Sequence, residues 1–272
     1  MQRQRPCAKY RIPFLTPALV ALAMVGAAVS PAQDAKPPEP KKGWETVANV
    51  GITLTRGNSK NFLASAGANS SRKWPGDELF LGANAGYGST TARRPGPDEE
   101  TTTEQYLKGF SQYNHLFTER LYSGLRVDGL YDKVAGIHYR FTISPMAGYY
   151  FIKTPNTLLS LEAGPSYILE EVVSRTSLGG HRIDDNSYVG ARVGQRFEHK
   201  FKAGAKVWET AEWIPQVTDV KNWILNAELG VSAPITKKLD TRLVLQDTYD
   251  NVPPVGRLKN DLKLIAGLAY KF

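Results

Sequence analysis

From residue 44 to residue 272, apolar and polar side chains alternate in one segment after another. The last segment shows this most clearly, because one face carries Leu262, Leu264, Ala266, Leu268, Tyr270 and Phe272. A period of two is typical of a β-strand whose two faces meet different surroundings. No long stretch has the spacing of an amphipathic helix. The pattern therefore predicts an all-β chain.

Turn signals divide this region into about twelve strands. We place them at residues 45–56, 60–73, 78–88, 102–116, 121–133, 139–152, 158–171, 186–198, 203–214, 219–233, 239–251 and 258–272. Most of these segments are longer than the five or six residues, roughly, of a soluble strand, and they match the about 9 to 11 residues that a tilted membrane-crossing strand needs. Strand length therefore favours an antiparallel transmembrane β-barrel over residues 44–272.

The connections between the strands give an independent indication. The even-numbered connections are all short turns, whereas the three long loops expected at residues 89–101, 172–185 and 252–257 all fall on odd-numbered connections. Outer-membrane barrels have tight turns on the periplasmic rim and longer loops on the other rim. An even strand number also returns both ends of the barrel to the periplasmic side.

Alternation alone does not distinguish a membrane barrel from a soluble β-sandwich whose apolar face packs inward. Aromatic residues near the strand ends favour the barrel, because two aromatic belts are typical of the two membrane interfaces. One predicted belt contains Trp44, Tyr149, Phe151, Tyr270 and Phe272, and the other contains Tyr87, Tyr131, Trp213 and Tyr249. A soluble periplasmic sandwich that binds carbohydrate stays open as an alternative.

In a barrel, the face opposite the apolar stripe lines the lumen. We predict twelve charged residues as lumen-lining: Arg126, Asp128, Arg140, Glu162, Arg192, Arg196, Lys206, Glu212, Glu228, Arg242, Asp261 and Lys263. Glu209 and Asp247 fall on the apolar face instead, which a bulge, a register slip or a position near the rim would explain.

The lumenal charges allow two interpretations. The five arginines of this set could form a basic ladder that guides anionic solutes through a narrow channel. Alternatively, each arginine pairs with a nearby Asp or Glu, because buried charges need partners. We favour pairing, since acidic residues are nearly as numerous as basic ones on this face.

The first 32 residues differ in kind from the rest. Four basic residues and no acidic residue precede an apolar run at residues 12–29, and the small residues 30–32 resemble a signal peptidase site. We expect a signal peptide cleaved after Ala32, followed by a linker rich in Pro and charge at residues 33–43. A retained membrane anchor is less favoured, because Pro13 and Pro17 shorten the usable helix.

Charge and hydropathy change their meaning once the signal peptide is removed. The full chain has 34 Lys and Arg against 26 Asp and Glu, a formal net charge of +8. Four basic residues leave with the signal peptide, so the mature balance is 30 against 26, or +4, with no cluster suited to nucleic acid. Cys7, the single cysteine, leaves too. The mean hydropathy of −0.34 argues against a bundle of membrane-spanning helices, but an alternating barrel averages to such a value.

Catalytic signatures are sparse. The four histidines are His115 and His199, near predicted periplasmic turns, and His138 and His181, near the outer rim, where Ser177 or Ser187 could approach them. No nucleophile elbow accompanies them, so we predict no enzyme activity, with a lipid-modifying barrel enzyme as the alternative. Residues 181–186 lack the spacing of a calcium-binding EF-hand loop. We expect no cofactor and no metal.

The C-terminus is the most specific feature. Leu264, Ala266, Leu268, Tyr270 and the terminal Phe272 resemble the signal that the barrel-assembly machinery recognises in outer-membrane proteins. With the hairpin at residues 55–59 (Thr-Arg-Gly-Asn-Ser), the mature chain resembles the YdiY-like family of salt-induced outer-membrane proteins, whose domain has no established function. The resemblance implies a protein in the outer membrane of a Gram-negative bacterium, in contact with its lipids. The role expected is structural, envelope-stress-related or narrow-channel.

Overall fold

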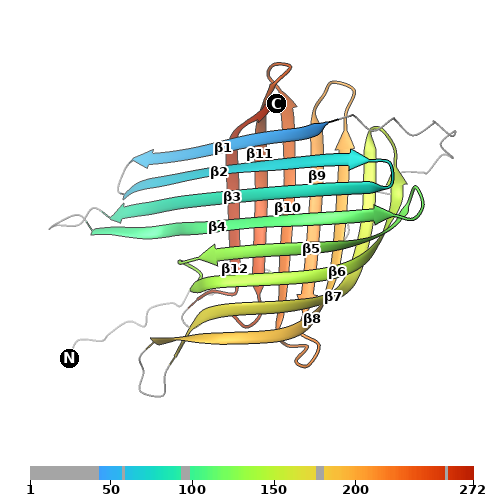
Figure 1. The fold of residues 1–272 in the computed structure, drawn as a ribbon. Helices are drawn as coiled ribbons and strands as arrows, with labels where there is room; N and C mark the ends of the chain where they lie inside the picture. The colour runs from blue at the N-terminus through green and yellow to red at the C-terminus, as the bar shows by residue number, and fades with distance from the viewer. Residues whose placement is uncertain (1–42, 57–58, 93–98, 176–180, 255–256) are drawn as a thin grey trace, which may run out of the picture. The chain divides into compact units, whose positions relative to one another are not determined.

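A computed structural model describes residues 43–56, 59–92, 99–175, 181–254 and 257–272. Twelve antiparallel strands close into a barrel in which each strand pairs with its neighbours in the chain and β1 pairs with β12 (Figure 1). The strands are β1 (Trp44–Arg56), β2 (Ser59–Trp74), β3 (Asp77–Ala92), β4 (Glu99–Leu116), β5 (Leu121–Asp132), β6 (Ile137–Lys153), β7 (Thr157–Arg175), β8 (His181–Lys200), β9 (Lys206–Pro215), β10 (Trp223–Pro234), β11 (Leu239–Asp250) and β12 (Asn260–Lys271). The predicted all-β barrel of about twelve strands is confirmed.

Two of the predicted long loops are wrong in extent. β3 continues to Ala92 and β4 begins at Glu99, while β7 continues to Arg175 and β8 begins at His181. The paired backbone of β7 and β8 runs up to Arg175 opposite His181. These strand ends consist mostly of polar residues, which gave no apolar alternation to reveal them. Backbone pairing does not require that alternation, so the hairpins extend past the apolar stripe.

The apolar stripe lies on the outside of the barrel. Ile52 is 66% exposed, Leu107 57%, Leu264 62% and Phe141 50%, values far above those of buried core residues. A closed barrel has no second sheet to cover these side chains. An exposed apolar band around a closed wall is the architecture of an outer-membrane-type barrel. Among the described residues, no helix is long and apolar enough to cross a membrane.

Glu209 and Asp247 stay on the outer face, and neither a bulge nor a register slip moves them. Glu209 lies opposite Leu229, and Asp247 lies opposite Leu262, in ladders without a register shift. Each is the fourth residue from an end of its strand, β9 or β11. Of the three explanations offered for these residues, only a position toward the rim is compatible with the structure.

Aromatic side chains gather near both strand ends on the outer face. At the end where β1 begins and β12 ends, Tyr149 packs edge-on against Phe151, and Tyr270 packs in the same way against Phe272. Near the other end, Trp223 stacks on Tyr249, and Tyr131 and Trp213 are exposed. The expected signal peptide, its cleavage after Ala32 and most of the linker lie outside the described residues.

Candidate functional site

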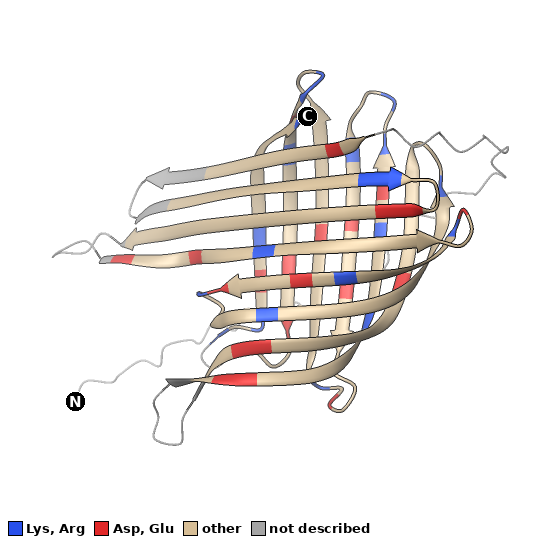
Figure 2. Cartoon of the chain, in the orientation of Figure 1, with Lys and Arg blue, Asp and Glu red and all other residues tan. Residues whose placement is uncertain are grey.

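The lumen contains the polar contacts that connect strands far apart in the sheet. Residues on non-neighbouring strands of a closed barrel can meet only across its interior, so such contacts identify the inward face. Lys and Arg positions are interspersed with Asp and Glu positions across the strands rather than forming a zone of one sign (Figure 2). The lumen is therefore the site where a passage would exist, and its contacts decide whether the passage is free.

Inward-facing aromatic rings lie flat against the wall over glycines. Tyr122 lies over Gly148 and Trp208 over Gly230, so closely that a Cβ atom on either glycine would overlap the ring. Each ring thus occupies the space that the side chain of any residue other than glycine would fill at position 148 or 230. This arrangement leaves room in the lumen for the long charged side chains.

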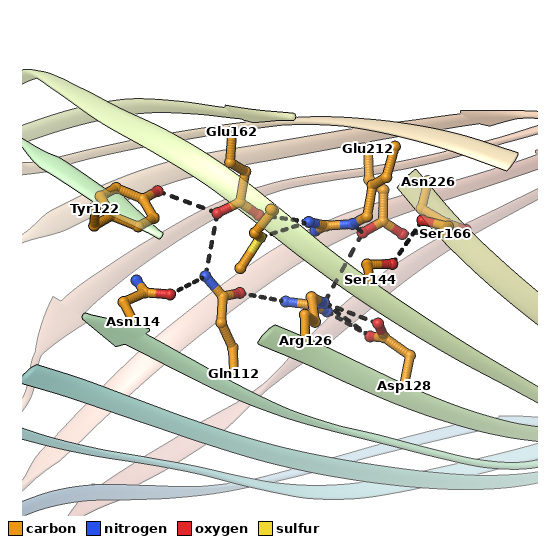
Figure 3. A network of polar contacts seen from close by, with 12 residues as sticks. Gln112, Asn114, Tyr122, Arg126, Asp128, Ser144, Glu162, Ser166, Glu212 and Asn226 are labelled. Carbon is orange, nitrogen blue, oxygen red and sulfur yellow. Dashed lines mark hydrogen bonds and ion pairs between the residues drawn. The ribbon is translucent and has the colours of Figure 1, made fainter. Parts of the chain in front are cut away.

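Arg192 of β8 is the centre of the lumenal network, because it binds both Glu162 and Glu212, which Figure 3 labels. Its Nη1 lies 2.7 Å from Oε1 of Glu162 on β7, and its Nε lies 2.6 Å from Oε2 of Glu212 on β9. The arginine side chain is only 4% exposed. Tyr122 donates a 3.1 Å hydrogen bond from its hydroxyl to Glu162, and Asn226 donates from Nδ2 to Glu212. Each buried charge therefore has an opposite charge and additional donors, as burial requires.

Arg126 of β5 extends this network across the lumen. Its guanidinium binds Asp128 through Nη2 at 2.7 Å and donates from Nη1 to Gln112 of β4, whose amide in turn donates to Glu162. Its Nε also lies 4.0 Å from Oε2 of Glu212 on β9, four strands away. One connected set of side chains thus joins strands β4, β5, β7, β8, β9 and β10 (Figure 3).

Two further ion pairs cross the lumen toward the end opposite the rim where β1 begins and β12 ends. Arg140 of β6 contacts Glu170 of β7 at 2.5 Å and Asp250 of β11 at 3.3 Å. Lys263 of β12 contacts Glu104 of β4 at 2.7 Å. Glu170 is on the strand next to Arg140, whereas the Arg140–Asp250 and Lys263–Glu104 pairs join strands that are not neighbours in the sheet. Side chains therefore bridge the lumen both at its centre and between the centre and this end of the barrel.

The lumen is also bridged near the rim where β1 begins and β12 ends. Tyr150 of β6 donates a hydrogen bond to buried Glu78 of β3. The guanidinium carbon of Arg196 on β8 lies 5.3 Å from the ring centre of Phe80 on β3. Arg196 and Lys206 share Glu198, at 3.3 and 3.0 Å. These contacts add a third level at which side chains from separated strands meet.

Arg242 of β11 is held differently. Among the described residues, no acidic oxygen lies within 4.0 Å of it, and its guanidinium carbon lies 5.2 Å from the ring centre of Trp208. The Trp208 indole donates at 2.7 Å to Glu228, which also accepts a 2.8 Å hydrogen bond from Gln246. Lys108 of β4 reaches across to Gln246 at 3.4 Å, and it too has no ion pair in the described part of the chain.

Each of the twelve residues predicted to line the lumen takes part in these inward contacts. Asp261 does so by an ion pair with Lys263 at 3.2 Å. Of the five arginines, four have an acidic partner, and Arg242 has none within the described residues. The lumenal partners that sequence reasoning missed include Glu78, Glu104, Lys108, Gln112, Tyr122, Glu170, Asn226, Gln246 and Asp250. Alternation along each strand already places these residues on the lumenal face. Which of them meet depends on which strands face each other across the barrel.

The histidines form no catalytic grouping in the described part of the chain. His138 lies 3.4 Å from Glu171, His115 lies 3.0 Å from Asp77, and His199 lies 2.8 Å from the Thr157 hydroxyl. The His181 side chain and Ser177 lie outside the described residues. Among the residues that the structure does describe, no group of three or more His, Cys, Asp or Glu side chains could hold a metal ion.

Comparisons with known proteins agree with the resemblance seen in the sequence. A family model described as "Protein of unknown function, DUF481" matches residues 48–272. No curated protein matches the sequence. Among solved structures, a NanC porin is 8% identical, covers 84% of this chain and 100% of that chain, and has a TM-score of 0.48. The translocator domain of the autotransporter NalP from Neisseria meningitidis is 13% identical, covers 84% and 87%, and has a TM-score of 0.43. The COG4313 outer membrane channel from Pseudomonas putida F1 is 12% identical, covers 84% and 94%, and has a TM-score of 0.43. Overlap at this level does not identify a function.

Proposed function

We propose that this chain, which belongs to the DUF481 family of proteins of unknown function, is an outer-membrane barrel with a structural role and a lumen closed to free solute passage. Twelve strands enclose more room than side chains fill in an eight-stranded barrel but less than in an open sixteen-stranded porin. Whether such a barrel conducts therefore depends on its lumenal side chains.

The observation that carries the proposal is the bridging of the lumen at three levels. The central bridge runs from Gln112 and Arg126 to Glu212, and Arg192 fixes Glu162 and Glu212 within it. Ions in an open channel would meet charges that are free to interact with them. Here most lumenal charges are already matched to each other, which opposes solvation of a continuous path.

The membrane placement is part of the same proposal. The exposed apolar band and the aromatic side chains near both strand ends support contact with outer-membrane lipids. Leu264, Leu268, Tyr270 and Phe272 are exposed on the outer face of the last strand, which supports recognition of this strand by the barrel-assembly machinery. Heat-modifiable migration on denaturing gels and extraction only by detergent are the expected results, and a mature protein that stays soluble would contradict them.

The proposal includes no catalytic activity. His138 contacts Glu171, but no serine or other nucleophile contacts this histidine among the described residues. We expect His138→Ala to leave the phospholipid and lipopolysaccharide profiles of cells that overproduce the protein unchanged. A lipid product that disappears in this variant would favour the lipid-modifying enzyme.

Single-channel recording of the refolded chain in a planar bilayer tests the closed lumen. We expect no steady conductance steps for the wild type. A charge-balanced variant, Arg126→Ala, Glu162→Ala, Arg192→Ala and Glu212→Ala, removes the central bridge and should conduct. Asp219→Ala with Lys221→Ala, in the extracellular connection between β9 and β10, is a charge-balanced control and should stay closed. Steady steps in the wild type would show that the barrel is a narrow channel instead.

A further inference from the structure

We propose that the outer wall at the periplasmic ends of β12, β1 and β2 binds anionic phospholipid headgroups of the periplasmic leaflet. We call this surface the seam belt; it consists of Trp44, Arg72, Trp74, Lys238, Tyr270 and Phe272. The inference rests on the membrane placement proposed above, and it adds a lipid class and a position on the barrel.

Arg72 is held on the outside of the wall between two tryptophans. It lies opposite Leu79 in the ladder of β2 and β3, on the face of the apolar stripe. Its guanidinium carbon lies 4.9 Å from the ring centre of Trp74 and 6.0 Å from that of Trp44. Trp44 is 45% exposed. The two rings fix the guanidinium at the surface while leaving its donors available.

Lys238 occupies the corresponding place on the other side of the barrel seam. Its Nζ lies 5.8 Å from the ring centre of Tyr270, which packs edge-on against Phe272. The amide of Lys271 donates to the carbonyl of Lys238 at 2.8 Å, and the amide of Phe272 donates to the carbonyl of Thr46 at 3.1 Å. The turn before β11, the chain end and β1 are thus one continuous surface.

The two cationic side chains of the seam belt, Arg72 and Lys238, have no ion-pair partner in the part of the chain that the structure describes. Within the described residues, no acidic oxygen lies within 4.0 Å of Arg72 or Lys238. Asp240 is buried and pairs with Lys271 at 2.7 Å. Asp77, which lies opposite Trp74, accepts hydrogen bonds from Tyr113 and contacts His115 at 3.0 Å. An anion from outside is therefore the partner that this surface lacks.

The position of the seam belt identifies the anion. Aromatic belts lie at the level of lipid headgroups, and the periplasmic turns place this one in the inner of the two leaflets. A guanidinium fits a phosphate through two parallel hydrogen bonds. A zwitterionic headgroup brings its own cation, which Arg72 and Lys238 would repel. A headgroup with a phosphate and no ammonium, such as phosphatidylglycerol, matches the charge of the belt.

Lipid retention by the full mature chain tests the inference. The protein is reconstituted in phosphatidylcholine bilayers that contain a minor share of phosphatidylglycerol, and the lipids that remain bound are counted by native mass spectrometry. We expect the wild type to retain phosphatidylglycerol in excess of its share. Arg72→Gln with Lys238→Gln should reduce this preference by about fivefold for each cation removed, or about 25-fold together.

Two variants make the result specific to the seam belt. Arg120→Gln with Lys202→Gln removes one arginine and one lysine from other turns of the same rim and should keep the preference. Arg72→Lys keeps the charge but loses the planar fork, so we expect a loss smaller than that of Arg72→Gln. An unchanged preference in the seam-belt variant, or an equal loss in the rim control, would overturn the inference. Failure of the wild type to insert, read from heat-modifiable migration, would instead refute the membrane placement itself.

Discussion

Arg192 and Arg242 both point into the same lumen, yet their surroundings differ. Arg192 binds Glu162 and Glu212 at 2.7 and 2.6 Å and is almost completely buried. Arg242 has no acid within 4.0 Å among the described residues and lies over the Trp208 ring instead. The barrel therefore stabilises lumenal cations in two ways. Arg192 is held by charge pairing on the wall from β7 to β9, and Arg242 is held by the aromatic ring of Trp208.

Glycine makes the second arrangement possible. Trp208 can lie flat because Gly230 has no side chain beneath it, and the indole is then fixed by its hydrogen bond to Glu228. The face of the ring that points away from the wall is available to Arg242. The paired arginine depends on its acids, whereas the stacked arginine depends on a glycine.

The largest effect should follow from removing the paired arginine. Arg192→Met leaves Glu162 buried without its cation and Glu212 with only Arg126 at 4.0 Å, so we expect the free energy of unfolding to fall by about 3 to 5 kcal/mol. Urea titration of the folded protein in lipid vesicles, followed by heat-modifiable migration, measures this change. Adding Glu212→Gln to Arg192→Met should recover part of the loss. A loss below about 1 kcal/mol for Arg192→Met would mean that the network is solvated rather than buried.

An intermediate effect is expected from filling the space under the tryptophan. In Gly230→Ala, the new Cβ would overlap the Trp208 ring, so the ring must leave the wall and its hydrogen bond to Glu228. Overpacking of this kind costs about 1 to 3 kcal/mol. Gly129→Ala is the control, because its nearest neighbour is a Phe141 ring carbon at 3.3 Å, at the end of a side chain that can move. Equal urea midpoints for the two variants would contradict the role assigned to Gly230.

The smallest effect should come from Arg242 itself. Arg242→Met removes a cation from the Trp208 ring without leaving an acid unpaired, because Glu228 keeps its two hydrogen bonds. We expect a loss of about 1 kcal/mol in the same urea titration. A loss as large as that of Arg192→Met would show that Arg242 compensates Glu228 at long range, and the contrast between the two arginines would disappear.

Much of this fold could be predicted from the chain, and the errors have physical causes. Alternation located all twelve strands because lipid and lumen select opposite residue types on the two faces. It missed the ends of β3, β4, β7 and β8, whose residues are mostly polar and do not alternate with apolar ones. It placed Glu209 and Asp247 on the outer face, where the structure also has them.

The sequence by itself determined the strand number, the face of each side chain and the mixture of both charges on the lumenal face, because a period of two is a local property of the backbone. Tertiary structure alone decided that Arg126 meets Glu212 and that Arg140 meets Asp250, four and five strands apart. It likewise decided that Arg192 is paired and Arg242 is stacked. Such contacts depend on how a barrel closes and which strands then face each other, and that geometry has no counterpart in the spacing of residues along one strand.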